Sequence, residues 1–336
     1  FTIQLSMFKN RNRGRKGKNT SMENMYELIA PCHFGLESVL KREILDLGYE
    51  IVTVEDGRIT FRGDVTAIAR ANIFIRTAER ILLKMGSFRA TDFDELFEGT
   101  KVITWEEFLP RDAKFWVTKA TTNKSALFSA SAIQSIVKKA IVERMKQTYR
   151  VERFEEDGDE YPIRVFIFKD QVSIGLDTSG KVVPKKVWYN AYDEAEDMIR
   201  RDVQMNIQGY DLDPEIVKCA KANAKAAGVG DYIHFQARDV KDLRHPKHYG
   251  FIITNPPYGE RLEEKEALPA LYKTIGESFA NLPDWSMYLI TSYEDAEKYI
   301  GRKADRNRKI YNGMIKSYFY QFMGPKPPKN KEPKEQ

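Results

Sequence analysis

The feature that most constrains the fold is a change of periodicity near residue 200, where short apolar runs begin to alternate with helical segments. Residues 206–209, 233–237 and 251–254 are predicted strands, and residues 214–227 are a predicted helix. A second helix, with apolar side chains at helical spacing from Leu268 to Phe279, precedes a predicted strand at 287–291. Such alternation is typical of a mostly parallel sheet, so this half of the chain is predicted to be α/β.

The residues before 200 follow a different order. Between residues 26 and 72 the pattern is strand, helix, two strands and helix, as in a small α+β unit of ferredoxin-like character. Predicted strands at 114–120, 163–168 and 171–177 accompany a long amphipathic helix at 125–149. At the far end, strands at 309–311 and 315–323 flank Asn312-Gly313, which is a strong hairpin signal.

Length and composition place the chain among globular proteins. Its 336 residues suffice for more than one domain, and 42% hydrophobic content suffices for ordinary cores. We find no apolar run long enough for a bilayer and no secretory leader, so a cytoplasmic protein is expected. Cys32 and Cys219 lack metal-ligand spacing, which predicts no disulfide and no metal site; both are predicted to be small core residues.

Basic residues gather in two places. The first is an arm, predicted to be disordered, with six Lys and Arg residues between Lys9 and Lys18; it either gathers nucleic acid or is a solvated tail. The second is the predicted helix at 125–149 and its surroundings. The residues there that could form an RNA-facing patch are Lys119, Lys124, Lys138, Lys139, Arg144, Lys146 and Arg150. A solvated helix face is the alternative.

The predicted strand at 251–254 ends in Asn255-Pro256-Pro257-Tyr258. Two prolines fix φ and remove backbone donors, which leaves the Asn255 side-chain oxygen and the Pro256 carbonyl as acceptors for a planar amino group. Tyr258 then offers a ring on which a base can stack. The pattern favours methyl transfer to an exocyclic nitrogen of adenine, guanine or cytosine. A proline-rich turn that closes a strand is the alternative.

Acidic residues follow the two preceding strands. Asp211 stands where an open α/β sheet binds nucleotide-like ligands, and its carboxylate can accept from both ribose hydroxyls. Asp213, followed by Pro214, fits a helix N-cap instead. Asp239 is placed to accept from an adenine amino group, although a surface-turn aspartate is the alternative. Two acids and Asn-Pro-Pro-Tyr after successive strands are more specific together than any member alone.

These motifs resemble those of the bacterial THUMP-domain methyltransferases, which use S-adenosylmethionine to modify guanine N2 of 23S ribosomal RNA and are often labelled N6-adenine-specific DNA methylases. The resemblance runs from Tyr26 to about Pro328. Its most specific segments are APCHFGLE (30–37), LDTSG (176–180), NIQGYDLDPE (206–215), TNPPYGERL (254–262), GRKADRNRKIYNG (301–313) and YQFMGPKPP (320–328).

The resemblance implies a domain order and a site. The order is a disordered basic arm at 1–24, a ferredoxin-like subdomain at 25–88, a THUMP domain at 89–180, a Rossmann-like methyltransferase domain at 181–324 and a disordered tail at 325–336. The implied catalytic residues are Asn255, Pro256, Pro257 and Tyr258, and the implied cofactor-binding residues are Asp211, Asp239 and Asn255. The implied cofactor is S-adenosylmethionine and the implied partner is RNA. Arg261 and Lys303 are candidate phosphate contacts, with an exposed structural role as the equal alternative.

The chain departs from the family after Gly180. Family members continue with a basic segment and helix, the first strand of the sheet and a Gly-rich turn, and none of these is present here. A strand, turn and helix need roughly 30 residues. Because that strand is central and its turn approaches the methionine part of the cofactor, two strand edges would stay unpaired and half of the cofactor site would be missing.

Two explanations of this departure are open. We expect that the printed sequence leaves out a stretch of an ordinary family member, because every other motif is intact; the alternative is an internal deletion. A chain that is complete as printed is expected to bind S-adenosylmethionine negligibly. Three other functions also fit: an adenine-N6 DNA methyltransferase, a transfer-RNA guanine-N2 methyltransferase, and a non-catalytic RNA-binding protein without a complete cofactor site.

Overall fold

A computed structural model describes residues 25–179, 182–200, 202–204, 206–259, 262–312 and 315–328. The predicted basic arm and most of the predicted tail lie outside these residues. The chain divides into two compact units between Ile199 and Arg200, and each unit is described by itself. No described helix combines the length and the apolar character that a membrane span needs.

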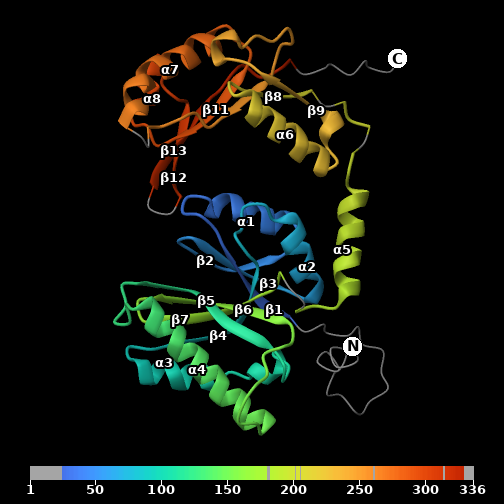
Figure 1. Cartoon of the computed structure of the whole chain (residues 1–336), viewed down its shortest axis with the longest axis vertical. Helices are drawn as coiled ribbons and strands as arrows, with labels where there is room; N and C mark the ends of the chain where they lie inside the picture. The colour runs from blue at the N-terminus through green and yellow to red at the C-terminus, as the bar shows by residue number, and fades with distance from the viewer. Residues whose placement is uncertain are drawn as a thin grey trace, which may run out of the picture. The chain divides into compact units, whose positions relative to one another are not determined.

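The first unit begins with a βαββαβ motif (Figure 1). Its elements are β1 (Tyr26–Pro31), α1 (Glu37–Asp46), β2 (Glu50–Glu55), β3 (Arg58–Gly63), α2 (Val65–Phe74) and β4 (Leu82–Arg89). The strands lie in the order β2-β3-β1-β4, and each neighbouring pair is antiparallel. This arrangement confirms the ferredoxin-like prediction. Asp64 begins α2 by accepting a hydrogen bond from the Ala67 amide, as expected of an N-cap aspartate.

The sheet continues through the next part of the chain. The further elements are α3 (Phe93–Lys101), β5 (Lys114–Asn123), α4 (Ala130–Tyr149), β6 (Glu160–Phe168) and β7 (Gln171–Asp177). β4 pairs with β7, which gives one seven-stranded sheet of order β2-β3-β1-β4-β7-β6-β5. β4 and α3 were not predicted from the sequence. The long helix starts at Ala130 rather than at residue 125, because Ser129 caps it through the Ala132 amide.

A single large core holds this unit together. It joins side chains of the ferredoxin-like strands to side chains of α3, α4, β6 and β7. Trp105 is among the largest of its fully buried side chains, and its indole Nε1 donates to the Thr100 carbonyl over 2.9 Å. Ile133, Val137, Ala140 and Ile141 of α4 are buried in the unit, which agrees with the predicted amphipathic helix.

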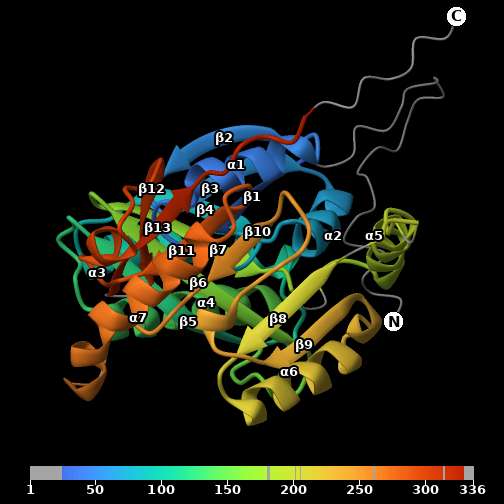
Figure 2. The same cartoon turned by 90° about the horizontal axis from the view of Figure 1, so that it is seen from above.

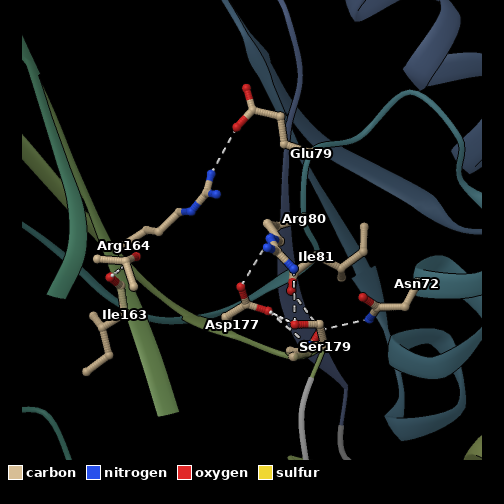
Figure 3. A network of polar contacts seen from close by, with 10 residues as sticks. Asn72, Glu79, Arg80, Ile81, Ile163, Arg164, Asp177 and Ser179 are labelled. Carbon is tan, nitrogen blue, oxygen red and sulfur yellow. Dashed lines mark hydrogen bonds and ion pairs between the residues drawn. The ribbon is translucent and has the colours of Figure 1, made fainter. Parts of the chain in front are cut away.

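The end of β7 is fixed by a polar network built from the LDTSG segment (Figure 3). Thr178 is fully buried, and its amide and hydroxyl both donate to the Ile81 carbonyl, over 3.1 and 2.7 Å. Its hydroxyl oxygen also accepts from Asn72 Nδ2 at 2.9 Å. The Asp177 carboxylate accepts from the amide and the hydroxyl of Ser179. The chain therefore leaves this sheet at a defined place, immediately before the point where it departs from the family.

A further helix, α5 (Lys185–Asp197), packs on α2 in the same unit. Arg70 of α2 donates to both Glu194 oxygens through Nε and Nη2, at 2.8 to 3.1 Å, and its Nη1 donates to the Tyr49 hydroxyl at 2.8 Å. Glu194 raises the pKa of the Arg70 guanidinium through these hydrogen bonds. The unit boundary thus follows α5, whereas the predicted domain boundary at 180/181 precedes it.

The second unit contains two separate sheets (Figures 1 and 2). One consists of the parallel strands β8 (Ile207–Asp211) and β9 (Ile233–Ala237), with α6 (Pro214–Ala226) packed beside them. The other has the order β10-β11-β13-β12. Its strands are β10 (Phe251–Thr254), β11 (Ser286–Thr291), β12 (Arg306–Asn312) and β13 (Ile315–Phe322), and its helices are α7 (Leu262–Ala280) and α8 (Ala296–Ile300).

The four-stranded sheet is mixed. β10 and β11 are parallel, whereas β13 is antiparallel to both β11 and β12. The register of β12 and β13 pairs Asn312 with Ile315, which confirms the predicted hairpin. One sheet face packs on α7 and α8 around Tyr272, Met287, Leu289 and Phe322. Together with the βα alternation, this mixed sheet confirms the α/β prediction.

The two cysteines differ in their surroundings. Cys32 is 5% exposed, and burial, with Glu37 and Glu79 nearby, raises the pKa of its thiol to about 12. Cys219 is exposed, so the prediction that it is a core residue is wrong. It lies on α6 two residues after the buried Val217, and two residues turn a helix by roughly 200°, to the opposite face.

We expect a thiol reagent at pH 8 to modify Cys219 at least about 100-fold faster than Cys32, because only a thiolate reacts and the Cys32 thiolate is strongly disfavoured. Titration of the native chain should therefore count one fast thiol, and titration after unfolding should count two. The Cys219→Ser variant should show no fast thiol; a fast thiol in that variant would contradict the burial of Cys32.

Candidate functional site

The two predicted acids lie at the same edge of the β8–β9 sheet. Because β8 and β9 run parallel with Asp211 opposite Ala237, their carboxyl ends coincide. The Arg238 amide, just before Asp239, donates to the Asp211 carbonyl over 2.8 Å. The structure therefore brings Asp211 and Asp239 to one edge, as the sequence predicted.

Asp211 and Asp213 have the different tasks expected of them. Asp213 caps α6 by accepting from the Glu215 amide at 2.8 Å, with Pro214 in the first turn, which confirms the predicted N-cap. Asp211 is exposed; its Oδ1 accepts from the Asp213 amide at 2.9 Å. No described residue donates to its second carboxylate oxygen, Oδ2, so that oxygen can still accept from a ligand.

Both carboxylate oxygens of Asp239, unlike those of Asp211, have partners in the structure. Its Oδ1 accepts from the Lys241 amide at 3.0 Å, and its Oδ2 lies 3.2 Å from Lys241 Nζ. These hydrogen bonds to Lys241 lower the pKa of the Asp239 carboxyl, which keeps it ionised. It thus caps the short 3-10 helix Val240–Asp242, which is the turn role considered as the alternative. A ligand amine at this edge would have to share the carboxylate with Lys241.

The Asn-Pro-Pro-Tyr segment directly follows β10. Asn255 and Pro257 are exposed, Pro256 is buried and Tyr258 is half-buried. Among the described residues, no donor reaches the Asn255 side-chain oxygen or the Pro256 carbonyl, so neither predicted acceptor is occupied by a hydrogen bond from them. The turn after Tyr258 needs Gly259, whose φ is +78° and whose Cβ position would lie 2.9 Å from the Lys265 side chain.

A chain of buried hydrogen bonds holds this segment from behind. The Tyr272 hydroxyl of α7 donates to the Pro257 carbonyl over 3.2 Å and lies 2.5 Å from Thr291 Oγ1. Because the single Tyr272 hydroxyl hydrogen is used on Pro257, the Thr291 hydroxyl must donate to Tyr272. Thr291 Oγ1 accepts in turn from the Tyr293 amide at 3.0 Å. These hydrogen bonds therefore connect the end of β11 to the carbonyl of Pro257.

Burial keeps this donor in place. Tyr272 is fully buried and Thr291 is 1% exposed, and desolvation raises the pKa of the Tyr272 hydroxyl to about 12. The hydroxyl therefore stays protonated through the neutral range. In the sequence, Tyr272 is only one of the apolar positions at helical spacing between Leu268 and Phe279. A hydroxyl on a buried face needs a partner, and that requirement was the signal that could have identified it.

The two halves of the predicted site are not joined by a sheet. Asn255 follows β10, and in the part of the chain that the structure describes β10 pairs with β11 alone, while β8 pairs with β9 alone. His245 and Lys247, in the segment between β9 and β10, make contacts that link the two sheets. Trp285 Nε1 donates to the Lys247 carbonyl at 3.0 Å, and its ring lies 4.8 Å from that of His245, whose Nε2 is 3.4 Å from Gln208 Nε2.

Two cavities of the second unit lie away from the candidate site. A cavity of about 500 Å³ lies between α6 and β9 and includes His234 and Lys221, and one of about 170 Å³ lies between α7 and α8. Neither is lined by Asp211, Asp239 or Asn255. In the part of the chain that the structure describes, Asp211 and Asn255 are exposed at the carboxyl ends of their strands.

The basic residues predicted to face RNA do not form one compact patch. Arg144 pairs with Glu106, Lys138 lies 3.3 Å from Glu156 and Lys146 lies 3.8 Å from Glu143, so three of the helix cations are engaged with carboxylates. Lys124 precedes α4 and Arg150 follows it, and a helix of 20 residues is about 30 Å long. Lys119, Lys124 and Arg150 are exposed, and RNA contact by them stays a prediction. Arg261 lies outside the described residues, and Lys303 is exposed.

Three family models match the chain in order. The RlmL ferredoxin-like domain matches residues 27–82, the THUMP domain matches residues 90–177, and the RMKL-like methyltransferase domain matches residues 176–321. The third match includes the ends of β8, β9 and β10, where the candidate site lies.

Relatives match over nearly the whole chain. "Putative RNA methyltransferase YpsC" of Bacillus subtilis (strain 168) is 36% identical, across 91% of this chain and 98% of its own length. A possible methylase from Clostridium difficile 630 is 40% identical with a TM-score of 0.85, over 91% of this chain and all of that one. SMU.472, "a putative methyltransferase complexed with SAH", is 30% identical with a TM-score of 0.82, over 91% of this chain and all of that one.

The alignment with YpsC also contains a large internal difference. Ninety-one per cent of 336 residues is about 306, so about 74 of the 380 aligned positions have no residue in this chain. Even so, identity of 36% over almost the full length of that relative identifies the family. The chain therefore belongs to the RMKL-like methyltransferases that carry an RlmL-type ferredoxin-like domain and a THUMP domain ahead of the methyltransferase domain.

Proposed function

We propose that this chain holds an unpaired RNA base for methylation of its exocyclic amine, and that the base is guanine, modified at N2, in 23S ribosomal RNA. The observation that carries the proposal is the segment Asn255–Tyr258 at the end of β10, in which no described donor occupies the two acceptors and Tyr272 holds the second proline. The RNA methyltransferase name of YpsC and the THUMP domain support RNA as the substrate class.

The chain's own residues orient the amine. The two N–H groups would donate to Asn255 Oδ1 and to the Pro256 carbonyl, which directs the nitrogen lone pair away from the protein. Tyr258, half-buried beside these acceptors, would stack on the base. Positioning of this kind supplies most of the rate in such a reaction, so no strong base is required. A paired nucleotide cannot reach these groups, and the target must be unpaired or flipped out.

The methyl donor proposed for the family is S-adenosylmethionine, consistent with the SAH complex of SMU.472. The residues present fit one half of it. Asp211 keeps a free carboxylate oxygen at the end of β8, suited to ribose hydroxyls, and Asp239 lies at the same edge. The sequence has no Gly-rich turn after a strand for the methionine half, and β8 and β10 do not pair. The chain as printed therefore does not fit the whole cofactor.

The function is best tested in a restored chain, in which the YpsC stretch between the counterparts of Gly180 and Lys181 is inserted here. With tritiated S-adenosylmethionine, we expect label to enter 23S ribosomal RNA as N2-methylguanosine, and little label to enter transfer RNA or duplex DNA. Label mainly in duplex DNA as N6-methyladenine, or mainly in transfer RNA, would refute the proposed substrate. The printed chain serves as the control and should transfer no methyl group.

A further inference from the structure

The hairpin of β12 and β13 is basic and aromatic, and the site described above does not use it. Between residues 306 and 322 there is no Asp or Glu, and the cations are Arg306, Arg308, Lys309 and Lys316. Core packing accounts for Tyr320 and Phe322, which are at most 3% exposed, but Tyr311 is 37% exposed. A surface that carries cations without carboxylates attracts an anionic partner.

The hairpin projects beyond the sheet edge at which Asn255 stands. β10 and β11 run parallel with Thr254 opposite Leu289, so both strands have their carboxyl ends at this edge. β13 pairs with β11 only from Tyr318 onward, whereas it pairs with β12 from Ile315 onward. The residues before Tyr318 therefore carry the hairpin about 10 Å past the end of β11, at roughly 3.4 Å per residue. Figure 1 shows this projection of β12 and β13.

One face of the projecting part carries two lysines and two tyrosines. Lys309 lies opposite Tyr318, and Tyr311 lies opposite Lys316. Residues directly opposite each other in an antiparallel pair share a face, and so do residues two apart on one strand. Each lysine thus has one tyrosine across from it and another two residues away. We call these four residues the lysine–tyrosine face.

Lys316 holds this face in position. Its Nζ donates to Glu294 Oε1 at 3.0 Å, in the turn that follows β11, and lies 5.0 Å from the centroid of the Tyr318 ring. Lys309, by contrast, is exposed, and no carboxylate among the described residues pairs with it. Lys316 is therefore a positioning residue, whereas the charge of Lys309 is left for a ligand.

We infer that the lysine–tyrosine face binds unpaired RNA next to the target base, with Lys309 on a phosphate and with Tyr311 and Tyr318 stacked on bases. The inference rests on the proposed function for its choice of RNA as the ligand. Aromatic rings beside cations hold single strands in proteins, because every base has a face to stack and every nucleotide has a phosphate.

The face is also tied to the Asn-Pro-Pro-Tyr segment. Tyr318 lies opposite Thr291 of β11, and Thr291 is hydrogen-bonded to Tyr272, which donates to the Pro257 carbonyl. The same buried hydroxyls therefore connect the two places. A strand of RNA that lies on the hairpin would present its neighbouring nucleotide at the edge where Asn255 stands.

Two other ligands fit less well. A double helix would offer phosphates to Lys309, but its bases are stacked on one another and present no free face to Tyr311. An acidic protein surface would pair with Lys309 and leave both tyrosine rings without a partner. An unpaired strand offers a phosphate to the lysine and base faces to the rings.

The first test is titration of the printed chain with a short unpaired RNA and with the same strand annealed to its complement. Tyr311→Ala should lower the affinity for the unpaired strand at least about fivefold, because a stacked base is lost, and should change the affinity for the duplex by less than about twofold. Lys309→Gln should make the slope of log K against log salt concentration shallower by about 0.7, the value for one phosphate of a single strand. Tyr311→Ala should leave that slope unchanged.

The matched controls are Arg306→Gln and Tyr232→Ala. Arg306 is an exposed cation of the same strand, and three residues separate it from Lys309, so it lies on the opposite face. Tyr232 is 42% exposed in the same unit. Neither variant should change the affinity by more than about twofold. Equal losses in Arg306→Gln and Lys309→Gln would show that charge alone attracts the RNA, and would overturn the inference.

The remaining outcomes also decide. Unchanged affinity for unpaired RNA in Tyr311→Ala would overturn the inference, as would a printed chain that binds no unpaired RNA. In the restored chain, Tyr311→Ala should raise the KM for RNA at least about fivefold with kcat unchanged. A restored chain that binds unpaired RNA through Tyr311 but methylates no RNA would refute the proposed function and leave the inference standing. Methylation of 23S ribosomal RNA with the same KM in Tyr311→Ala would do the reverse.

Discussion

Asn255→Ala in the restored chain should lower methyl transfer to RNA by about 100-fold or more, with RNA affinity changed by less than about twofold. The amine would lose one of its two acceptors, so its lone pair would no longer be directed away from the protein. The Pro256 carbonyl alone cannot fix a planar group that can rotate about a single hydrogen bond. Single-turnover methylation and a filter-binding titration with the same RNA measure the two quantities.

The matched control for this change is Asn307→Ala, which removes an exposed asparagine from β12 in the same unit. It should leave both quantities unchanged. Retention of most of the activity by Asn255→Ala would show that the segment is a structural turn. An equal loss of RNA affinity and activity would instead place Asn255 in RNA binding.

The parts of the site that lie on one strand and its end could be predicted from the sequence. β8, β9 and β10 are short apolar runs followed by an acid or by Asn-Pro-Pro-Tyr, and parallel pairing alone places Asp211 and Asp239 at one edge. The N-cap role of Asp213 followed from Pro214 in the next position. These sequence signals depend only on neighbouring residues. They therefore do not require the central strand of the sheet.

The parts that depend on distant contacts could not be predicted. The Tyr272 hydroxyl acquires its role from Pro257 and Thr291, which lie 15 and 19 residues away in sequence. Helix α5 has one buried side chain, Ala191, and is held on α2 through Arg70 and Glu194. Cys219 was predicted to be buried because cysteine usually is, but its helix buries another face.

The central strand differs from these cases, because its absence could be predicted from the resemblance and its consequences are visible in the structure. Within the described ranges, the unpaired edges expected from the sequence are found at β8 and β10. The exposure of Phe251 and Ile253 on β10 was not predicted, since strand periodicity does not say which helix covers which face of a sheet. Both side chains are exposed. The missing element is therefore visible in the packing of β10 as well as in its hydrogen bonding.

Tyr272→Phe should lower the free energy of unfolding of the second unit by about 1–3 kcal/mol, because the substitution leaves the buried Thr291 hydroxyl without its acceptor and the Pro257 carbonyl without its donor. In the restored chain it should also lower methyl transfer by about 10- to 100-fold, since the loss of this anchor moves the segment that aims the amine. Urea denaturation followed by far-UV circular dichroism and single-turnover methylation measure the two effects.

Thr291→Val breaks the same hydrogen-bond chain one link earlier and should lower both quantities in the same direction. Because Tyr272, Thr291 and Pro257 form one chain, the double variant should lose less than the sum of the single losses, with a coupling of about 0.5–3 kcal/mol. Tyr232→Phe, at an exposed tyrosine of the same unit, is the matched control and should change neither quantity. Additive losses would show that the two hydroxyls act separately, and unchanged methylation in Tyr272→Phe would show that Asn255 and Pro256 hold their positions without support from behind.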